Sequence, residues 1–303
     1  MKKPIFWDKS YLFERQNGHQ SFLKYQDTHW VDFQLAEISE HEHEKAPTII
    51  FSKDKASLTS PFRASFGGIH LGGESKTNSA ELVKKLNAYL SLNKTSHAKI
   101  TLHPSHLNST QFVNEQTYLQ NAWKILHENI NHYVDMGTWS EECMSKGNRK
   151  KLRQCLGSGL MFSEATPLDW IDAYEVVKKN RESLGSRVSM SEIELFALLT
   201  SYPDTYKCFV LKDYLNQIAA SAFLVETSCE NIYVYLWADV PEFRNLSPIV
   251  FLMSQLVSTF REKYSFLDLG TSAINGEVLE GLSRFKDNLG ASPSHKLQVQ
   301  WQS

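Results

Sequence analysis

The chain has 303 residues, of which 42% are hydrophobic and 22% are charged, as expected of a globular protein with a sizeable core. Its formal net charge of −2 excludes a chain that is basic throughout, as many nucleic-acid-binding proteins are. The four cysteines form no C-x-x-C pair, which argues against a zinc site or a disulfide scaffold and favours reduced thiols. No apolar run approaches the about 18 residues that cross a bilayer, and the N-terminus lacks a signal-peptide core. We therefore expect a cytoplasmic protein.

The first part of the chain reads as a mixture of strands and helices. Hydrophobic periodicity and capping residues predict a strand over 46–54, a helix over 78–92, a strand over 98–104, a helix over 114–129 and a strand over 131–137. A glycine-bearing stretch, residues 60–73, precedes the first helix. These elements form a predicted first domain, residues 1–137.

The second part, residues 138–303, gives a clearer pattern. It predicts helices over 138–159, 167–185, 189–203, 247–264 and 276–290, and strands over 160–165, 206–213, 217–227, 231–239, 265–270 and 295–301. The strands over 206–239 are antiparallel, because their connections are too short for a crossover. A long helix joins strands 231–239 and 265–270, so these two can lie parallel. We expect the sheet to splay where they meet, leaving backbone groups for a linear ligand.

Three segments resemble the Fem family of GNAT acyltransferases (FemA, FemB and FemX-like proteins). Residues 267–291, LDLGTSAINGEVLEGLSRFKDNLGA, resemble the family's C-terminal signature, in which a strand ending in Asp-x-Gly precedes a helix with Phe-Lys and a closing Gly-Ala. Residues 148–162 resemble its basic helix, and residues 60–69 its glycine-bearing segment. The resemblance implies an α/β fold with a mixed sheet and two GNAT-like domains side by side. Residues 1–137 would form a wall of the acceptor groove, and residues 138–303 the more complete acyltransferase domain.

The resemblance also implies an activity, namely acyl transfer to an amine of a cell-envelope or polysaccharide precursor, an amino sugar or a peptide. The donor implied first is an acyl-CoA, with acetyl-CoA favoured. Ordinary GNAT domains bind its pyrophosphate with a glycine-rich loop, whereas residues 239–249 here, DVPEFRNLSPI, contain no glycine. Two alternatives therefore stay open: an aminoacyl-tRNA-dependent transferase of the Fem type, and a non-catalytic binding protein on a degenerate GNAT fold.

Three residues are candidates for catalysis. Lys286 matches the family's Phe-Lys position, where a cation can stabilise a developing oxyanion; otherwise it is a solvated lysine. Asp268 lies in an apolar strand, so its carboxylate must be paired or functional. Asp239 ends the strand over 231–239 and serves either as a base or as a turn residue.

The donor site is expected at the start of the helix over 247–264. Arg244, Asn245 and Ser247 precede that helix and are candidates to bind phosphate; Ser247 could equally be only its N-cap. No metal is expected, because the histidines of HEH and HPSH lack a third ligand in register.

Two further groups are candidates for acceptor contact. The first lies in the glycine-bearing stretch and consists of Arg63, Ser65, Gly67, Gly68 and His70; the alternative is a tight structural connection. The second is Arg149 with Arg153, four residues apart in the run KGNRKKLR. The five cations of this run do not share one helix face, so a solvated surface is the alternative, and binding of tRNA remains the less favoured reading.

Overall fold

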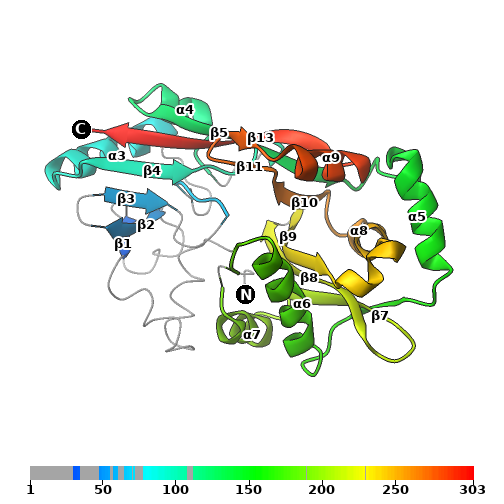
Figure 1. Cartoon of the computed structure of the whole chain (residues 1–303). Helices are drawn as coiled ribbons and strands as arrows, with labels where there is room; N and C mark the ends of the chain where they lie inside the picture. Colours follow the sequence, from blue (N-terminus) through cyan, green and yellow to red (C-terminus); the bar gives the residue numbers. More distant parts are fainter. Residues whose placement is uncertain are drawn as a thin grey trace. The chain divides into compact units, whose positions relative to one another are not determined.

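The computed structural model describes residues 30–34, 48–54, 57–60, 65–69, 71, 78–107, 112–188, 190–228 and 230–303 (Figure 1). The chain forms two compact units. The C-terminal unit contains Asn131–Ser272 and Leu279–Pro293; the N-terminal unit contains the described residues up to Ile130 together with Ala273–Val278 and Ser294–Ser303. The predicted division into domains at residue 137 stays a prediction. Each unit is described by itself.

The N-terminal unit is a mixed sheet with a helix packed against it. Its elements are β1 (Trp30–Gln34), β2 (Thr48–Asp54), β3 (Ser57–Ser60), α3 (Ser79–Leu92), β4 (His97–Thr101), α4 (Glu115–Leu119), the first half of β5 (Lys124–Asp135), β11 (Ala273–Ile274), β12 (Glu277–Val278) and β13 (Ser292–Gln302). The strand order is β1-β2-β3-β4-β13-β5, with β3 and β4 parallel. Leucines at helical spacing on α3 are buried against this sheet, and the Asn78 side chain caps the helix as predicted.

The C-terminal unit is built from strands and helices. They are the 3-10 helix η2 (Glu141–Cys143), α5 (Lys146–Leu156), β6 (Met161–Glu164), α6 (Trp170–Ser183), α7 (Glu192–Ser201), β7 (Tyr206–Lys212), β8 (Ile218–Ser228), β9 (Asn231–Asp239), the 3-10 helix η3 (Pro241–Leu246), α8 (Pro248–Phe260), β10 (Phe266–Thr271) and α9 (Glu280–Asn288). Together with the second half of β5, the strands follow the order β5-β10-β9-β8-β7-β6. Strands β7, β8 and β9 are antiparallel, as predicted, and β6 pairs antiparallel with β7.

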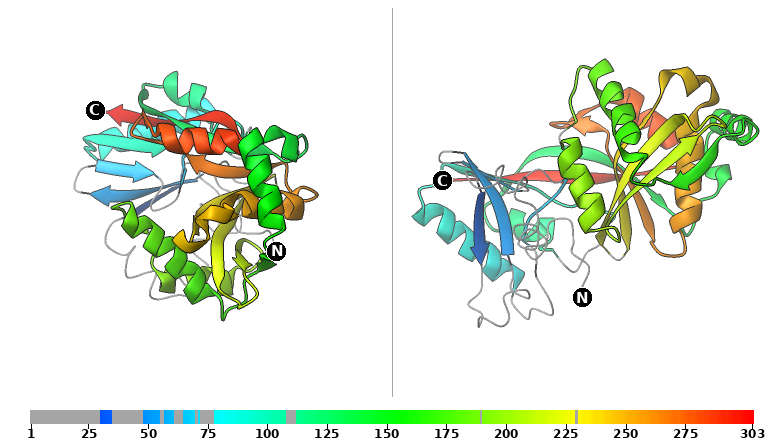
Figure 2. Two further views of the ribbon diagram at one scale, coloured as in Figure 1. Left: turned by 45° about the vertical axis from the view of Figure 1, so that its right-hand side comes forward. Right: turned by 90° about the horizontal axis from the view of Figure 1, so that it is seen from below.

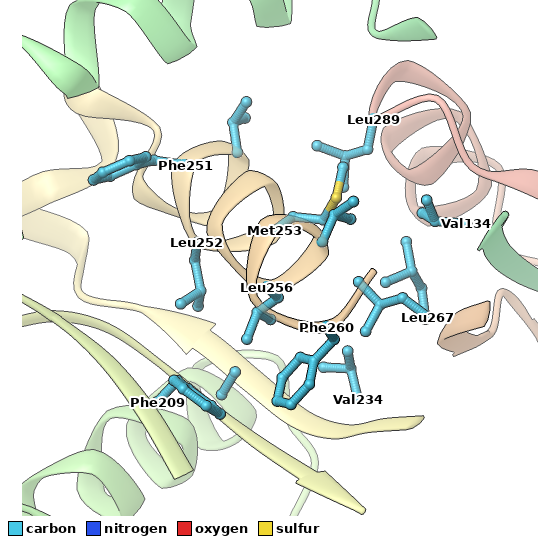
Figure 3. Close-up of a cluster of buried hydrophobic side chains, with 14 of the residues drawn as sticks. Val134, Phe209, Val234, Phe251, Leu252, Met253, Leu256, Phe260, Leu267 and Leu289 are labelled. Atoms are coloured by element: carbon cyan, nitrogen blue, oxygen red, sulfur yellow. The ribbon is translucent and has the colours of Figure 1, made fainter. Parts of the chain in front are cut away.

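Helices cover both faces of this second sheet. Ser221 on β8 donates a hydrogen bond to the Ala173 carbonyl of α6, whereas its neighbours Ala220 and Ala222 belong to the apolar cluster around α8. Because side chains alternate along a strand, α6 and α8 lie on opposite faces of β8. Figure 3 shows the α8 side, where side chains of α8 meet those of the strands and of α9. Two further views of the ribbon show both layers (Figure 2). The expected mixed α/β fold class is confirmed.

One predicted helix is wrong. The pattern over 114–129 predicts a single helix, but α4 ends at Leu119 and β5 begins at Lys124. Ala122 adopts a positive φ of 68°, which ends the helix, and the Trp123 indole donates a hydrogen bond to the Asn87 side chain. Pairing with neighbouring strands therefore overrides local helix propensity after residue 122.

Two other predicted helices are shorter than expected. The segment over 138–159 is divided into η2 and α5, because Met144 has an extended ψ of 151° and Ser145 caps α5 instead. The segment over 276–290 becomes helical only from Glu280, since Glu277 and Val278 pair with Ala273 and Ile274. In the described part of the chain, no helix combines the length and apolarity needed to span a membrane.

Candidate active site

The site is organised by a β-bulge in β10. Strand β10 pairs with β5 from Phe266 to Asp268, and the register shifts before Gly270. Gly270 has a φ of +79°, which glycine adopts without strain. The Asp268 carboxylate, 1% exposed, accepts hydrogen bonds from the Gly270 amide (2.7 Å) and from Asn131 Nδ2 (2.9 Å). The sequence left two alternatives for this carboxylate, paired or functional, and the structure shows that it is paired while a function stays a prediction. Bulges of this kind re-aim side chains next to active sites.

Lys286 approaches the same glycine from α9. Its ammonium donates hydrogen bonds to the Gly270 carbonyl and to the Thr271 carbonyl, both at 2.9 Å, and the residue is only 2% exposed. Lys286 is therefore not the solvated helix lysine of the alternative interpretation. Burying an ammonium is costly unless it is hydrogen-bonded, and here two backbone carbonyls accept its hydrogens. Asp268 and Lys286 thus converge on Gly270.

Strands β9 and β10 part beside this point. They pair in parallel over three positions and their pairing ends at Asp268 with Tyr233, although β9 continues to Asp239. The splay predicted from the sequence is present. A Cβ atom on Gly270 would lie 3.3 Å from the Tyr233 ring, so this ring packs directly on the glycine. Further along β9, Trp237 contacts Phe285, the residue before Lys286, with ring centroids 6.2 Å apart.

The predicted donor-site residues gather where β9 leads into α8. Arg244 Nε lies 3.1 Å from Asp239 Oδ1, and the Arg244 side chain is 49% exposed. Asn245 is exposed as well. Ser247 is the N-cap of α8, but it has a positive φ of 54° and its side chain makes no capping hydrogen bond. Arg244 and Asp239 therefore contact each other.

Sequence reasoning missed His132, a buried histidine next to this site. Its Nδ1 lies 3.1 Å from Ser272 Oγ, and its Nε2 lies 3.2 Å from Asp287 Oδ1 and 3.4 Å from Ser283 Oγ. The sequence offered no clear signal for it, because both faces of β5 also carry other polar residues. Burial lowers the pKa of His132, and the nearby Lys286 cation lowers it further, while Asp287 opposes the change.

Comparisons with known proteins agree with this architecture. No protein-family model matches the chain, and neither does any curated protein. Among solved structures, the crystal structure of FemX matches with a TM-score of 0.63 over 91% of this chain and 89% of that chain, at 14% identity. The chain has a FemX-like fold. The C-terminal domain of a putative lysylphosphatidylglycerol synthetase from Agrobacterium fabrum matches with a TM-score of 0.57 over 85% of this chain and 81% of that chain, at 14% identity.

A third structure supports the same fold. The L-PGS structure from Bacillus licheniformis matches with a TM-score of 0.57, at 13% identity, over 84% of this chain and 81% of that chain. Identities this low establish the fold and leave the chemistry to be argued from the residues. The fold that the resemblance of the three segments implied is confirmed.

In this FemX-like fold, the basic helix α5 is attached to the helix that carries Lys286. The Ser145 amide (3.0 Å) and Asn148 Nδ2 (2.9 Å) both donate to the Asn288 carbonyl at the end of α9. Of the five cations in this run, Lys151 lies apart from the others. The other four lie at helical spacing on the side of α5 away from its buried residues: Lys146, Arg149, Lys150 and Arg153. A role for Arg149 and Arg153 in acceptor binding stays a prediction.

The backbone just after α9 packs closely against η2, and this contact allows a prediction about stability. Gly290 has a φ of +79°, and a Cβ atom there would lie 2.7 Å from the Cys143 Cβ. We expect Gly290→Ala to lower the free energy of unfolding by about 3 kcal/mol, from backbone strain plus overpacking. Gly159→Ala is the matched control, because Gly159 has a φ of +81° but open space around it. Urea unfolding of both variants measures the difference, and equal losses would contradict the close approach.

The glycine-bearing stretch has a packing role in the N-terminal unit. Gly68 has a φ of +111°, and a Cβ there would lie 3.3 Å from the Tyr118 hydroxyl, which accepts a hydrogen bond from the Ile69 amide. Gly67 is buried and its amide donates to the Thr101 carbonyl, while Ser65 is half-buried. Arg63 and His70 lie outside the described residues. Acceptor contact by this stretch stays a prediction.

The remaining groups to consider are potential metal ligands and the cysteine thiols. No cluster of three or more histidine, cysteine or acidic side chains there could hold a metal ion. The described cysteines Cys143, Cys155 and Cys208 are free thiols, and the latter two are buried. Burial raises the pKa of both buried thiols, which makes them poor nucleophiles.

Proposed function

We propose that the chain is an N-acyltransferase that moves an acyl group from acyl-CoA to an amine of a cell-envelope or polysaccharide precursor. The observation that carries this proposal is the buried Lys286 ammonium, fixed on the Gly270 and Thr271 carbonyls beside the place where β9 and β10 part. A preorganised cation in a water-poor site stabilises negative charge as it develops, and this effect is commonly the largest in acyl transfer. The FemX-like fold supports the reaction class by analogy.

The residues divide the work as follows in this proposal. Acyl-CoA supplies the activated thioester. Lys286 stabilises the charge that develops on the carbonyl oxygen under attack. Asp268 accepts the hydrogen bond of the Gly270 amide and so stabilises the β-bulge. The bulge in turn positions the backbone carbonyls that bind the Lys286 ammonium. Asp239 orients Arg244.

The start of α8 partly fits the phosphates of an acyl-CoA donor. Its N-terminus carries partial positive charge, the Ser247 hydroxyl does not cap it, and Arg244 is half-exposed next to it. Against this fit, the 3-10 helix η3 replaces a glycine-rich loop, and Asp239 offsets the charge of Arg244. Acetyl-CoA remains the donor we propose first, with longer acyl-CoA second.

Calorimetric titration with acetyl-CoA and with free CoA tests the donor. We expect saturable binding that Arg244→Ala weakens about tenfold, since a charge-assisted phosphate contact is worth about 1.4 kcal/mol or more. Arg187→Ala, at an exposed arginine distant in sequence from η3, is the matched control and should bind as the wild type does. Absence of binding to the folded protein would contradict acyl-CoA as the donor.

The cationic side of α5 favours one alternative donor. A Fem-type enzyme that uses aminoacyl-tRNA would bind RNA there, with an affinity that falls steeply as salt is raised. We would expect Arg149→Ala with Arg153→Ala to reduce that salt dependence. If neither CoA nor tRNA binds, the remaining hypothesis is a non-catalytic binding protein on this fold.

A further inference from the structure

His132 links a buried hydroxyl to a solvent-exposed carboxylate. On one side its Nδ1 lies 3.1 Å from Ser272 Oγ, and Ser272 is completely buried. On the other side its Nε2 lies 3.2 Å from Asp287 Oδ1, and the Asp287 side chain is 53% exposed. The imidazole itself is 1% exposed. Three side chains from β5, α9 and the residue after β10 therefore form one hydrogen-bonded path from the interior to solvent.

The hydrogen bonds fix the direction of this path. A carboxylate only accepts, so the imidazole must carry its hydrogen on Nε2 and donate it to Asp287. The unprotonated Nδ1 then accepts the hydrogen of the Ser272 hydroxyl. The charged groups that face His132 are Lys286 and Asp287 on α9 and Asp268 on β10. Burial and the Lys286 cation keep His132 neutral, which leaves Nδ1 able to take up a proton.

The inner end of the path adjoins the proposed reaction site. Ser272 follows Gly270 and Thr271, whose carbonyls hold the Lys286 ammonium. Asp287 follows Lys286 on α9, so one end of the path is next to a carbonyl that binds the cation and the other end is next to the residue that carries it. An amine nitrogen that attacks a thioester must lose one proton before the amide is complete.

We propose that Ser272, His132 and Asp287 form the proton-release path of the acyl-transfer site; this inference rests on the function proposed above. The acceptor nitrogen forms its bond to the acyl carbon as the bond from that carbon to the thioester sulfur breaks, and CoA leaves as the thiolate. The proton that the amine loses replaces the Ser272 hydroxyl proton, which moves to His132 Nδ1. The Nε2 proton moves to Asp287 and then to water. The cycle closes when Nε2 regains a proton from water through Asp287 and the Nδ1 proton returns through Ser272 to the CoA thiolate, which restores the Nε2–H tautomer and gives the thiol. His132 and Asp287 are positioning residues that act through Ser272.

Histidine NMR tests the path without any turnover. Protein labelled with ¹⁵N at histidine is titrated with pH, and His132→Gln identifies the His132 signal. We expect the Nε2–H tautomer and a pKa below 6.5 in the wild type. Asp287→Asn should lower the His132 pKa further, because the carboxylate stabilises the imidazolium, whereas Glu280→Gln, an exposed change on the same helix, should leave it unchanged. An Nδ1–H tautomer, or a His132 pKa insensitive to Asp287→Asn, would overturn the path.

Enzyme kinetics give a second test. When acyl transfer is measured by the release of thiol, kcat should rise as pH increases through the His132 pKa, because only the neutral imidazole accepts a proton. His132→Gln should lower kcat about 10- to 100-fold and remove that acidic limb. Asp287→Asn, a surface change that leaves the fold intact, should lower kcat about tenfold. Unchanged pH profiles in both variants would overturn the proton path. Absence of transfer in the wild type would overturn the proposed function, and the NMR experiment would still test the hydrogen bonds of His132 because it needs no turnover.

Discussion

Replacing Lys286 with methionine should reduce the proposed acyl transfer by about 100-fold or more in kcat/KM. The substitution keeps an unbranched side chain one atom shorter but removes the ammonium that is fixed on the Gly270 and Thr271 carbonyls. Loss of one group that stabilises a developing oxyanion typically costs a factor of about 100 to 1000. A factor of 100 corresponds to about 2.7 kcal/mol of transition-state stabilisation. The measurement is the rate of thiol release from the acyl-CoA donor.

Stability must be separated from activity in this experiment. Lys286→Met leaves two buried carbonyls without their donor, which should lower the free energy of unfolding by about 1–3 kcal/mol. Lys178→Met is a suitable control, because Lys178 makes only a surface ion pair with Glu175, a contact of little energetic value. Urea unfolding and the kinetic assay are applied to both variants. A folded Lys286→Met protein that keeps the wild-type kcat/KM would contradict a catalytic role for the ammonium.

Much of the C-terminal unit could be predicted because its elements follow local rules. Strand β9 coincides with the predicted range 231–239, where buried and half-buried residues alternate from Ile232 onward. Helix α8 begins at Pro248, as the proline and the apolar periodicity indicate. The parallel pairing of β9 with β10 follows from the helix between them. Local patterns failed at residues 120–129, where strand pairing determines the conformation and the amphipathic pattern resembles a helix.

The site was predictable only in part, for a related reason. Asp268 and Lys286 could be found because a charged residue in a buried strand, or at a position that matches a family signature, is visible in one segment. His132 could not be found in this way. Its partner Asp287 lies 155 residues further along the chain, and its partner Ser272 lies 140 residues away. Only the fold places these three side chains together, so periodicity carries no information about them.

Replacing Asp268 with alanine should cause the largest loss of stability of the substitutions considered. The change leaves the Gly270 amide and Asn131 Nδ2 buried without their acceptor. Each unsatisfied donor costs about 1–3 kcal/mol, so we expect the free energy of unfolding to fall by about 4 kcal/mol. Asp268→Asn keeps one acceptor oxygen and should cost about half as much. Asp172→Ala, at an exposed carboxylate on α6, should change stability by less than about 1 kcal/mol.

A double-mutant cycle decides whether Asp268 and Lys286 act as one unit. Asp268 binds the amide of Gly270 and Lys286 binds its carbonyl, so each side chain helps to hold the same backbone turn. If the bulge relaxes once either partner is lost, the second substitution removes less than it does alone. We therefore expect the combined Asp268→Ala and Lys286→Met variant to be less destabilised than the sum of the two changes, by about 0.5–3 kcal/mol. Strict additivity would mean that the bulge is held by its other strand contacts, and that Asp268 does not position the carbonyls on which Lys286 depends.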